Sequence, residues 1–93
     1  MAPFKNVYIP DSDMVAHRCP CCRKLTMHGR GNDDICPVCF WEDDGQDDHD
    51  ADEVRGGPNL RLSLTQARAN FTKIGAFSPE CLHLVRPPTP QEE

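Results

Sequence analysis

The chain has few of the residues that build a large hydrophobic core. Only 6% of its 93 residues are aromatic and 38% are hydrophobic, while nine prolines and six glycines limit the length of regular elements. A domain of this size buries a smaller share of its surface than a larger one, so its core alone gives marginal stability. We therefore expect a crosslink, such as a disulfide or a metal ion, to support the fold.

Long hydrophobic runs are also missing. No stretch approaches the roughly 18 apolar residues of a membrane-spanning helix. No apolar signal segment follows the N-terminal Met1-Ala2-Pro3. These absences predict a cytoplasmic protein. In a reducing compartment, paired cysteines are more often metal ligands or redox groups than structural disulfides.

Two cysteine pairs share the same local sequence. Cys19-Pro20-Cys21-Cys22 and Cys36-Pro37-Val38-Cys39 both read Cys-Pro-x-Cys, and thirteen residues separate them. Two residues between ligands allow a tight turn to direct both sulfurs at one ion, and proline after the first cysteine favours such a turn. Four thiolates at this spacing are typical of tetrahedral zinc. The predicted ligands are Cys19, Cys22, Cys36 and Cys39.

Other interpretations of the cysteines stay open. Cys21, His17 or His28 could replace one of the four ligands. Iron also suits four tetrahedral thiolates and is the less favoured metal. Two redox-active pairs without a metal are a further alternative, but the βαβ pattern typical of a thioredoxin-like site is missing.

The residues around the pairs predict a zinc-ribbon-like β-hairpin. Leu25-Thr26-Met27 can form a short strand, turn-forming residues follow it, and Ile35 leads back to the second pair. This arrangement places one cysteine turn at each end of the hairpin. Phe40 and Trp41 are expected to cover the metal site and to supply much of the small core.

A single helix is predicted in the C-terminal half. Ser63 and Gln66 have the spacing of a capping box, and Gly75 is placed to end the helix. Four apolar residues share one helical face, namely Leu64, Ala67, Phe71 and Ile74. The fold class is therefore a small metal-stapled α+β fold with one C-terminal helix.

These features divide the chain into five segments. An N-terminal segment (1–16) with an edge strand at Val7-Tyr8-Ile9 precedes the metal-binding ribbon (17–41). An acidic loop (42–58) follows the ribbon. The helix then lies in a packing segment (59–86), where Cys81, Leu82, Leu84 and Val85 are expected to point inward. Residues 87–93 are predicted to be a flexible tail.

The cysteine motifs resemble a known family. Cys19-Pro20-Cys21-Cys22, the run from Ile35 to Gly45, the helix sequence from Ser63 and the Val85-Arg86-Pro87 ending together resemble the bacterial cysteine-rich CPCC family, over about residues 17–87. Two positions depart from its pattern: Arg23 stands where glycine is common, and Asp33 lies near a frequently aromatic position. The resemblance implies a small bacterial protein and does not imply a particular biochemical activity.

Residues 42–53, here called the acidic segment, contain eight acidic residues and no Lys or Arg. The rest of the chain has ten basic and seven acidic residues. Such a segment is either a solvated loop or a surface that attracts a basic partner. The candidate partner-binding residues are Trp41, Glu42, Asp43, Asp44, Asp47, Asp48 and Asp50. We therefore favour a protein-interaction module, such as an immunity or antitoxin-type inhibitor of a basic toxin.

Other functions are less favoured. An enzyme is not expected, because four cysteines close the coordination sphere that catalytic zinc keeps open. A nucleic-acid-binding ribbon could use Arg18, Arg23, Lys24 and Arg30 on phosphates, but the net charge of −5 opposes it. Those cations could instead offset the charge of the metal site. In a thiol or metal sensor, Cys21 would react when the metal leaves.

Overall fold

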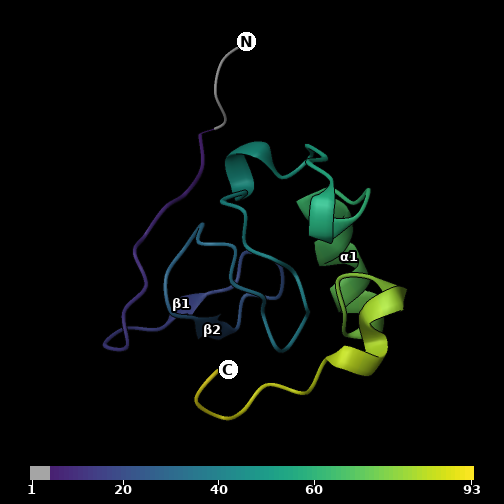
Figure 1. Cartoon of the computed structure of the whole chain (residues 1–93). Helices are drawn as coiled ribbons and strands as arrows, with labels where there is room; N and C mark the ends of the chain where they lie inside the picture. The colour runs from purple at the N-terminus through teal and green to yellow at the C-terminus, as the bar shows by residue number, and fades with distance from the viewer. Residues whose placement is uncertain (1–4) are drawn as a thin grey trace.

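The computed structural model describes residues 5–93, so residues 1–4 of the predicted N-terminal segment lie outside the described residues. Figure 1 shows a small ribbon on one side and the C-terminal helices on the other. The elements in order are β1 (His17–Arg18), β2 (Leu25–Met27), η1 (Asp48–Asp50), η2 (Gly57–Asn59), α1 (Leu64–Ile74) and η3 (Pro79–Leu84). Across the described part of the chain, no helix is long and apolar enough to span a membrane.

The two strands form an antiparallel hairpin. His17 pairs with Met27 and Arg18 with Leu25, with an irregularity between the two pairs. The structure therefore corrects the predicted hairpin, in which residues 25–27 returned through Ile35. The partner of β2 is the short strand that precedes the first cysteine pair. Ile35 instead forms an isolated bridge with Glu42, across the second pair.

The helix prediction is confirmed. Ser63 caps α1 and forms a capping box with Gln66, and Gly75 follows the helix in the left-handed conformation, with φ of 84°. Leu64 and Ala67 are fully buried, and Phe71 packs against the same core. The shared apolar face therefore docks α1 onto the ribbon.

The core lies between α1 and the cysteine turns. Trp41 and Phe77 meet edge to face, with their ring centroids 5.7 Å apart. The Phe77 amide donates to the Cys39 carbonyl at 2.9 Å, so the chain that leaves α1 returns to the second turn. Arg68 of α1 donates to the Pro20 carbonyl of the first turn at 2.8 Å. The helix is thus bonded to the first turn, and the segment that follows it is bonded to the second.

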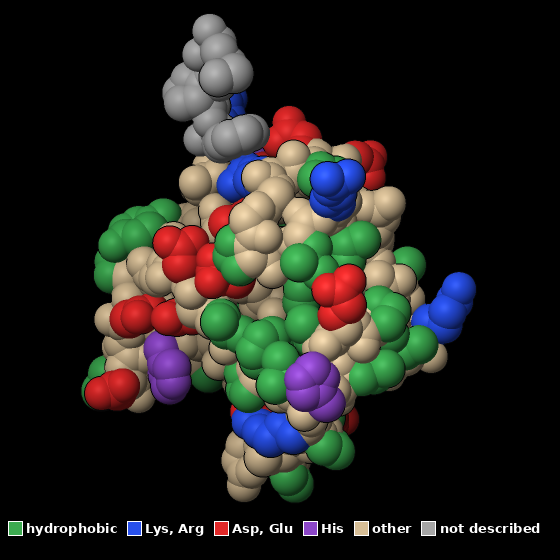
Figure 2. Space-filling model, turned by 45° about the vertical axis from the view of Figure 1, so that its right-hand side comes forward, with side chains coloured by type: hydrophobic (Ala, Val, Ile, Leu, Met, Phe, Trp, Pro, Cys, Tyr) green, Lys and Arg blue, Asp and Glu red, His purple; other side chains and the backbone are tan. Residues whose placement is uncertain are grey.

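The segment after α1 differs from the prediction. Residues 79–84 form the 3-10 helix η3. Leu82 and Leu84 are exposed rather than packed inward, because a 3-10 helix of this length can turn only part of its surface to the core. Cys81 does pack against the core. Figure 2 shows hydrophobic side chains gathered on the face that α1 and η3 present.

Both ends of the described part of the chain contact the ribbon. The predicted edge strand at residues 7–9 is reduced to one bridge, between Ile9 and Arg30. Residues 87–93 were predicted to be a flexible tail, but they return beside the ribbon (Figure 1), where the Leu25 amide donates to the Glu92 carbonyl at 2.7 Å. Arg86 also forms two hydrogen bonds to the Glu92 carboxylate.

Candidate metal centre

The two cysteine turns have the same backbone geometry. In the first, the Cys19 amide donates to Lys24 and the Arg23 amide to Cys19. In the second, the Cys36 amide donates to Trp41 and the Phe40 amide to Cys36. The repeat of Cys-Pro-x-Cys in the sequence is therefore a repeat of structure, and each turn directs its two sulfurs to the same side.

The residue after each turn has a positive φ, 67° at Arg23 and 70° at Phe40. This left-handed conformation favours glycine, so neither residue is an intrinsically good choice there. Positive φ at the same place in both turns indicates that closing the turn requires it.

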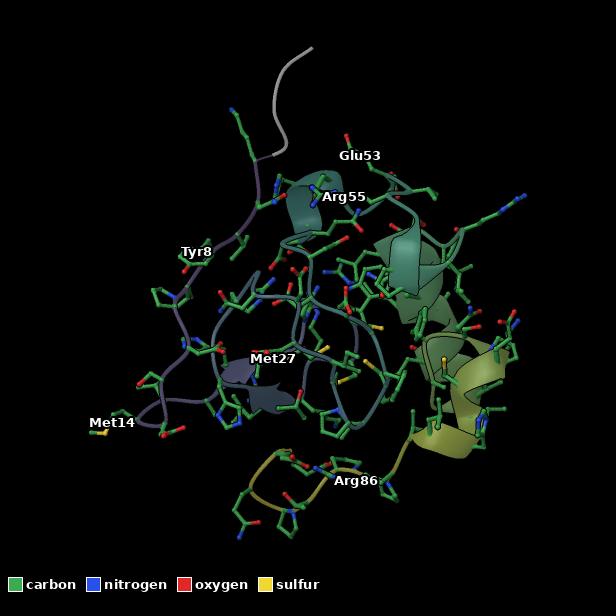
Figure 3. The ribbon with its side chains drawn as sticks, in the orientation of Figure 1. Tyr8, Met14, Met27, Glu53, Arg55 and Arg86 are labelled. Carbon is green, nitrogen blue, oxygen red and sulfur yellow. The ribbon has the colours of Figure 1, made fainter. Side chains whose placement is uncertain are left out.

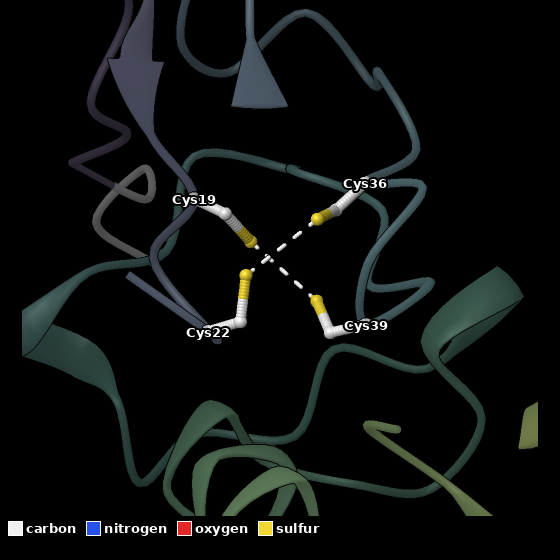
Figure 4. Close-up of side chains that lie close together, drawn as sticks. All are labelled: Cys19, Cys22, Cys36 and Cys39. Carbon is white, nitrogen blue, oxygen red and sulfur yellow. Dashed lines mark hydrogen bonds between the residues drawn. The ribbon is translucent and has the colours of Figure 1, made fainter. Parts of the chain in front are cut away.

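The four predicted cysteines come together, as Figure 4 shows. Their sulfur atoms all lie within 4.8 Å of one another. Two sulfur pairs, Cys19 with Cys39 and Cys22 with Cys36, are each 3.6 Å apart. This separation excludes a disulfide, whose sulfurs are about 2.05 Å apart. It fits a tetrahedral ion with metal–sulfur bonds of about 2.3 Å, which places its ligands roughly 3.8 Å from each other.

All four thiols are buried. Polar neighbours reach two of the sulfurs: the Thr26 hydroxyl lies 3.0 Å from Cys36 Sγ, and the Trp41 amide donates to Cys39 Sγ at 3.5 Å. A buried thiolate is costly without a partner. The described residues therefore offer a closed, soft donor set that suits a divalent ion.

The thiols compete for protons when no cation is near. Burial raises the pKa of Cys19, and contact with Cys19 raises the pKa of Cys39. Contacts with the other three thiols, that of Cys19 foremost, lower the pKa of Cys36. The Cys22 pKa is lowered as well, first by Cys19. The contacts thus favour thiolates at Cys22 and Cys36 at the expense of Cys19 and Cys39. A bound divalent cation allows all four to ionise together.

Cys21 occupies the spacer position that Val38 has in the other turn, and both side chains are buried. The alternative ligands Cys21, His17 and His28 are not part of the cluster. Within residues 5–93, no other set of three or more His, Cys, Asp or Glu side chains is close enough to hold an ion.

The predicted partner surface needs correction at two residues. Trp41 is 0% exposed and Asp43 1% exposed, so neither side chain can meet a partner in this structure. Trp41 is buried because its ring packs on Phe77 beside the cysteine turns. Asp43 is buried because its carboxylate accepts from Arg30 Nε at 2.8 Å and from the Gly31 amide at 2.9 Å.

Much of the acidic segment pairs with arginines from other parts of the chain. Arg30 also contacts Asp47 at 2.9 Å, and Arg55 pairs with Asp50 near η1 (Figure 3). Asp48 is largely exposed, yet it contacts Arg68 at 2.8 Å and Arg23 at 3.0 Å. Glu42 and Asp44 are partly buried.

These arginine partners were not predicted. The excess of basic over acidic residues outside the acidic segment was the one sequence signal that could have indicated them. Two alternatives had Arg30 contacting phosphates or offsetting the charge of the metal site, but it is buried in ion pairs with the acidic segment. Lys24 pairs with Glu93 at 3.4 Å. Of the four cations proposed for nucleic acid, at least Arg30 is therefore inaccessible.

Comparisons with known proteins point to one family. The family model described as "Cysteine-rich CPCC" matches residues 17–92, which include both cysteine turns, the acidic segment and α1. No curated protein and no solved structure matches the chain.

Proposed function

The chain belongs to the cysteine-rich CPCC family, and we propose that it is a non-enzymatic protein-interaction module whose four-cysteine centre holds a structural zinc ion. The observation that carries the proposal is the group of four buried sulfurs within 4.8 Å of one another. Structural zinc sites are closed and four-coordinate, whereas catalytic sites keep a position for water. A closed donor set therefore supports a structural role and argues against an enzyme.

Zinc is proposed over iron because zinc is the common tetrahedral ion of paired Cys-x-x-Cys turns. The free thiols also suit the reducing cytoplasm that we propose as the location. The backbone of the two turns holds the four sulfurs in place. Arg68 of α1 bonds to the first turn, and Phe77, in the segment after α1, bonds to the second. In this role the ion joins two turns that are far apart in the sequence.

The test is the metal content of the purified protein, compared among single cysteine variants. We expect one zinc per chain in the original protein and a loss of stoichiometric zinc in Cys36→Ser. Cys21→Ser is the matched control, since it removes a buried thiol of the adjacent turn outside the cluster. Cobalt loading should give the visible spectrum of a tetrahedral thiolate site. Stoichiometric iron, or zinc that survives Cys36→Ser, would contradict the zinc assignment.

For the interaction role, we propose a basic protein partner of the immunity or antitoxin type. The supporting observations are the net charge of −5 and the exposed acidic side chains at Asp48, Asp52 and Glu53. Complementary charge speeds association with a cationic protein. The usable surface is the outer edge of the acidic segment, because Trp41 and Asp43 are internal.

Co-expression with the product of the neighbouring gene tests this role. Growth rescue from a toxic, basic product supports an inhibitor. Replacing Asp52 and Glu53 by Asn and Gln should then slow association and weaken its dependence on salt, while Glu80→Gln, an exposed charge on η3, serves as control. A neighbour without toxicity, or association rates that salt leaves unchanged, would count against the proposal.

A further inference from the structure

The start of the described chain lies extended along the ribbon. Residues 5–12, here called the strap, run beside residues 28–32 and Gly45, here called the track (Figure 1). Main-chain bonds hold the two together: Val7 donates to Gly45 at 2.8 Å, and Ser12 donates to His28 at 2.8 Å. Ile9 and Arg30 exchange a pair of bonds at 2.9 and 2.8 Å, as in an antiparallel ladder.

Three glycines make this close approach possible. A Cβ atom added at Gly29 would lie 2.4 Å from the Ile9 carbonyl oxygen, and one at Gly31 would lie 2.1 Å from the Val7 carbonyl oxygen. At Gly45, it would lie 2.5 Å from Asn6 Cβ. A side chain at any of these three glycine positions would therefore push the strap away. The track is shaped to receive the backbone of another extended segment.

The side chains of the strap contribute little to this contact. Tyr8 is 64% exposed, and Met14, just beyond the strap, is 89% exposed; Figure 3 shows both pointing away from the ribbon. Only Val7 and Ser12 of the strap are partly buried. Little buried apolar surface would therefore become exposed to water if the strap left the track. A segment held by main-chain bonds is also the arrangement by which proteins add a partner's strand to a sheet edge.

Polar side chains recognise the two ends of the strap. Arg55 Nη1 donates to Asn6 Oδ1 at 2.7 Å, and the His49 ring bonds to the Lys5 carbonyl. At the other end, Asn32 Nδ2 donates to Asp11 Oδ1 at 2.9 Å and to the Ile9 carbonyl at 2.8 Å. The contacts thus favour an acceptor side chain at one position and a second acceptor side chain five residues later. They leave the residues between these positions free to vary.

We propose that the track is a binding site for an extended peptide segment of a partner protein, carrying Asn or Asp at its first position and again five residues later, and that the strap occupies this site until the partner displaces it. The family match begins at residue 17, so the track lies inside the matched region and the strap outside it. The proposal rests on the interaction role proposed above but uses a different surface from the acidic edge. Failure of the peptide test below therefore leaves the zinc and toxin tests unaffected.

The test uses the full chain with a protease recognition sequence inserted between Met14 and Val15, both of which are exposed. The folded protein is cut, and a fluorescent synthetic peptide of residues 5–14 is added as the probe. We expect the probe to replace the cut strap saturably with one site per chain. The uncut chain should bind the probe at least about tenfold more weakly, because its tethered strap competes at a high effective concentration.

Peptide variants supply the matched controls while the protein stays the same. Asp11→Ala and Asn6→Ala peptides should each bind roughly tenfold more weakly, through loss of one charge-assisted hydrogen bond. Tyr8→Ala should bind as well as the original, because that side chain points to solvent. No saturable replacement, or equal binding of the Asp11→Ala and Tyr8→Ala peptides, overturns the proposal.

Hydrogen exchange on the intact chain gives an independent readout. The Arg30 amide, bonded to Ile9, should exchange by local opening, well before the Phe77 amide that bonds to Cys39 in the core. Exchange of both amides only at global unfolding would mean that the strap cannot leave, which overturns the proposal. If the intact chain forms dimers whose fraction rises with protein concentration, a second copy of the chain occupies the track. That result would overturn the assignment to a partner protein.

Discussion

At the residue scale, the contact between Arg30 and Asp43 decides what the acidic segment does. By composition, Asp43 is only one of the eight acidic residues in the acidic segment. In the structure it is buried, bonded to Arg30 and accepting from the Gly31 and Gly45 amides. Removing two charges from water is costly, so a buried ion pair is stable only if both charged groups keep their hydrogen-bond partners. Asp43 is therefore a structural residue that fixes the segment to the ribbon.

We predict that Asp43→Asn strongly destabilises the metal-loaded protein, because it leaves the buried guanidinium of Arg30 with a neutral neighbour. Breaking a buried pair costs about 3 to 5 kcal/mol in other proteins, and the remaining contact with Asp47 places this variant near the lower value. Urea unfolding measures the change. Glu53→Gln removes the same charge from an exposed residue and should have little effect. Equal stability of the two variants would contradict the structural role of Asp43.

At the scale of elements, α1 could be predicted from neighbouring residues, whereas the position of the C-terminal residues could not. The capping box and Gly75 mark the ends of α1 in the sequence, because these signals work between near neighbours. The position of residues 87–93 depends instead on distant groups, with Glu92 bonded to Arg86 and its carbonyl bonded to Leu25. Composition alone therefore indicated a flexible tail.

The bond with Arg86 lowers the pKa of Glu92 to about 2. A lowered pKa means that the charged carboxylate stabilises the attached tail above its ordinary pKa of 4.5, and that this contribution is lost as the pH falls toward 2. Acid would also release the metal, so substitution at neutral pH is the cleaner test.

We predict that Glu92→Gln speeds hydrogen exchange at the Leu25 amide, because that amide donates to the Glu92 carbonyl. Arg86 is exposed and only the Glu92 side chain is partly buried, so water screens the pair in part. The expected acceleration is therefore modest, roughly two- to fivefold. Gln91→Ala, at the exposed neighbouring residue, is the control and should leave the rate unchanged. An unaltered rate in Glu92→Gln would show that the ion pair does not hold the tail.

At the scale of the whole molecule, the cysteine centre is the point on which the elements converge. Both turns supply sulfurs, β1 and β2 lead into and out of the first turn, and α1 bonds to the first turn through Arg68. The helix has only eleven residues. Isolated helices shorter than about 12 to 15 residues are marginal in water, so α1 depends on this docking.

We therefore predict that a strong chelator unfolds the chain cooperatively. The helical circular dichroism should fall and Trp41 emission should shift to the red, because a side chain now 0% exposed would enter water. Added zinc should restore both signals. Metal should also be lost as the pH falls, since protons compete for the thiolates. A metal-free protein that keeps its helix and a buried Trp41 would contradict this prediction.

The sequence by itself determined the features that depend on short spacings. Two Cys-Pro-x-Cys turns predicted four clustered cysteines, and the structure brings those four together. Capping and periodicity predicted α1 from neighbours within a few turns. Only the tertiary structure decided the pairing of β2 with β1, the burial of Asp43, and the position of the strap on three glycines. The Arg30–Asp43 pair and the strap contacts join residues that are distant in the chain. Composition cannot say which arginine will meet which acid.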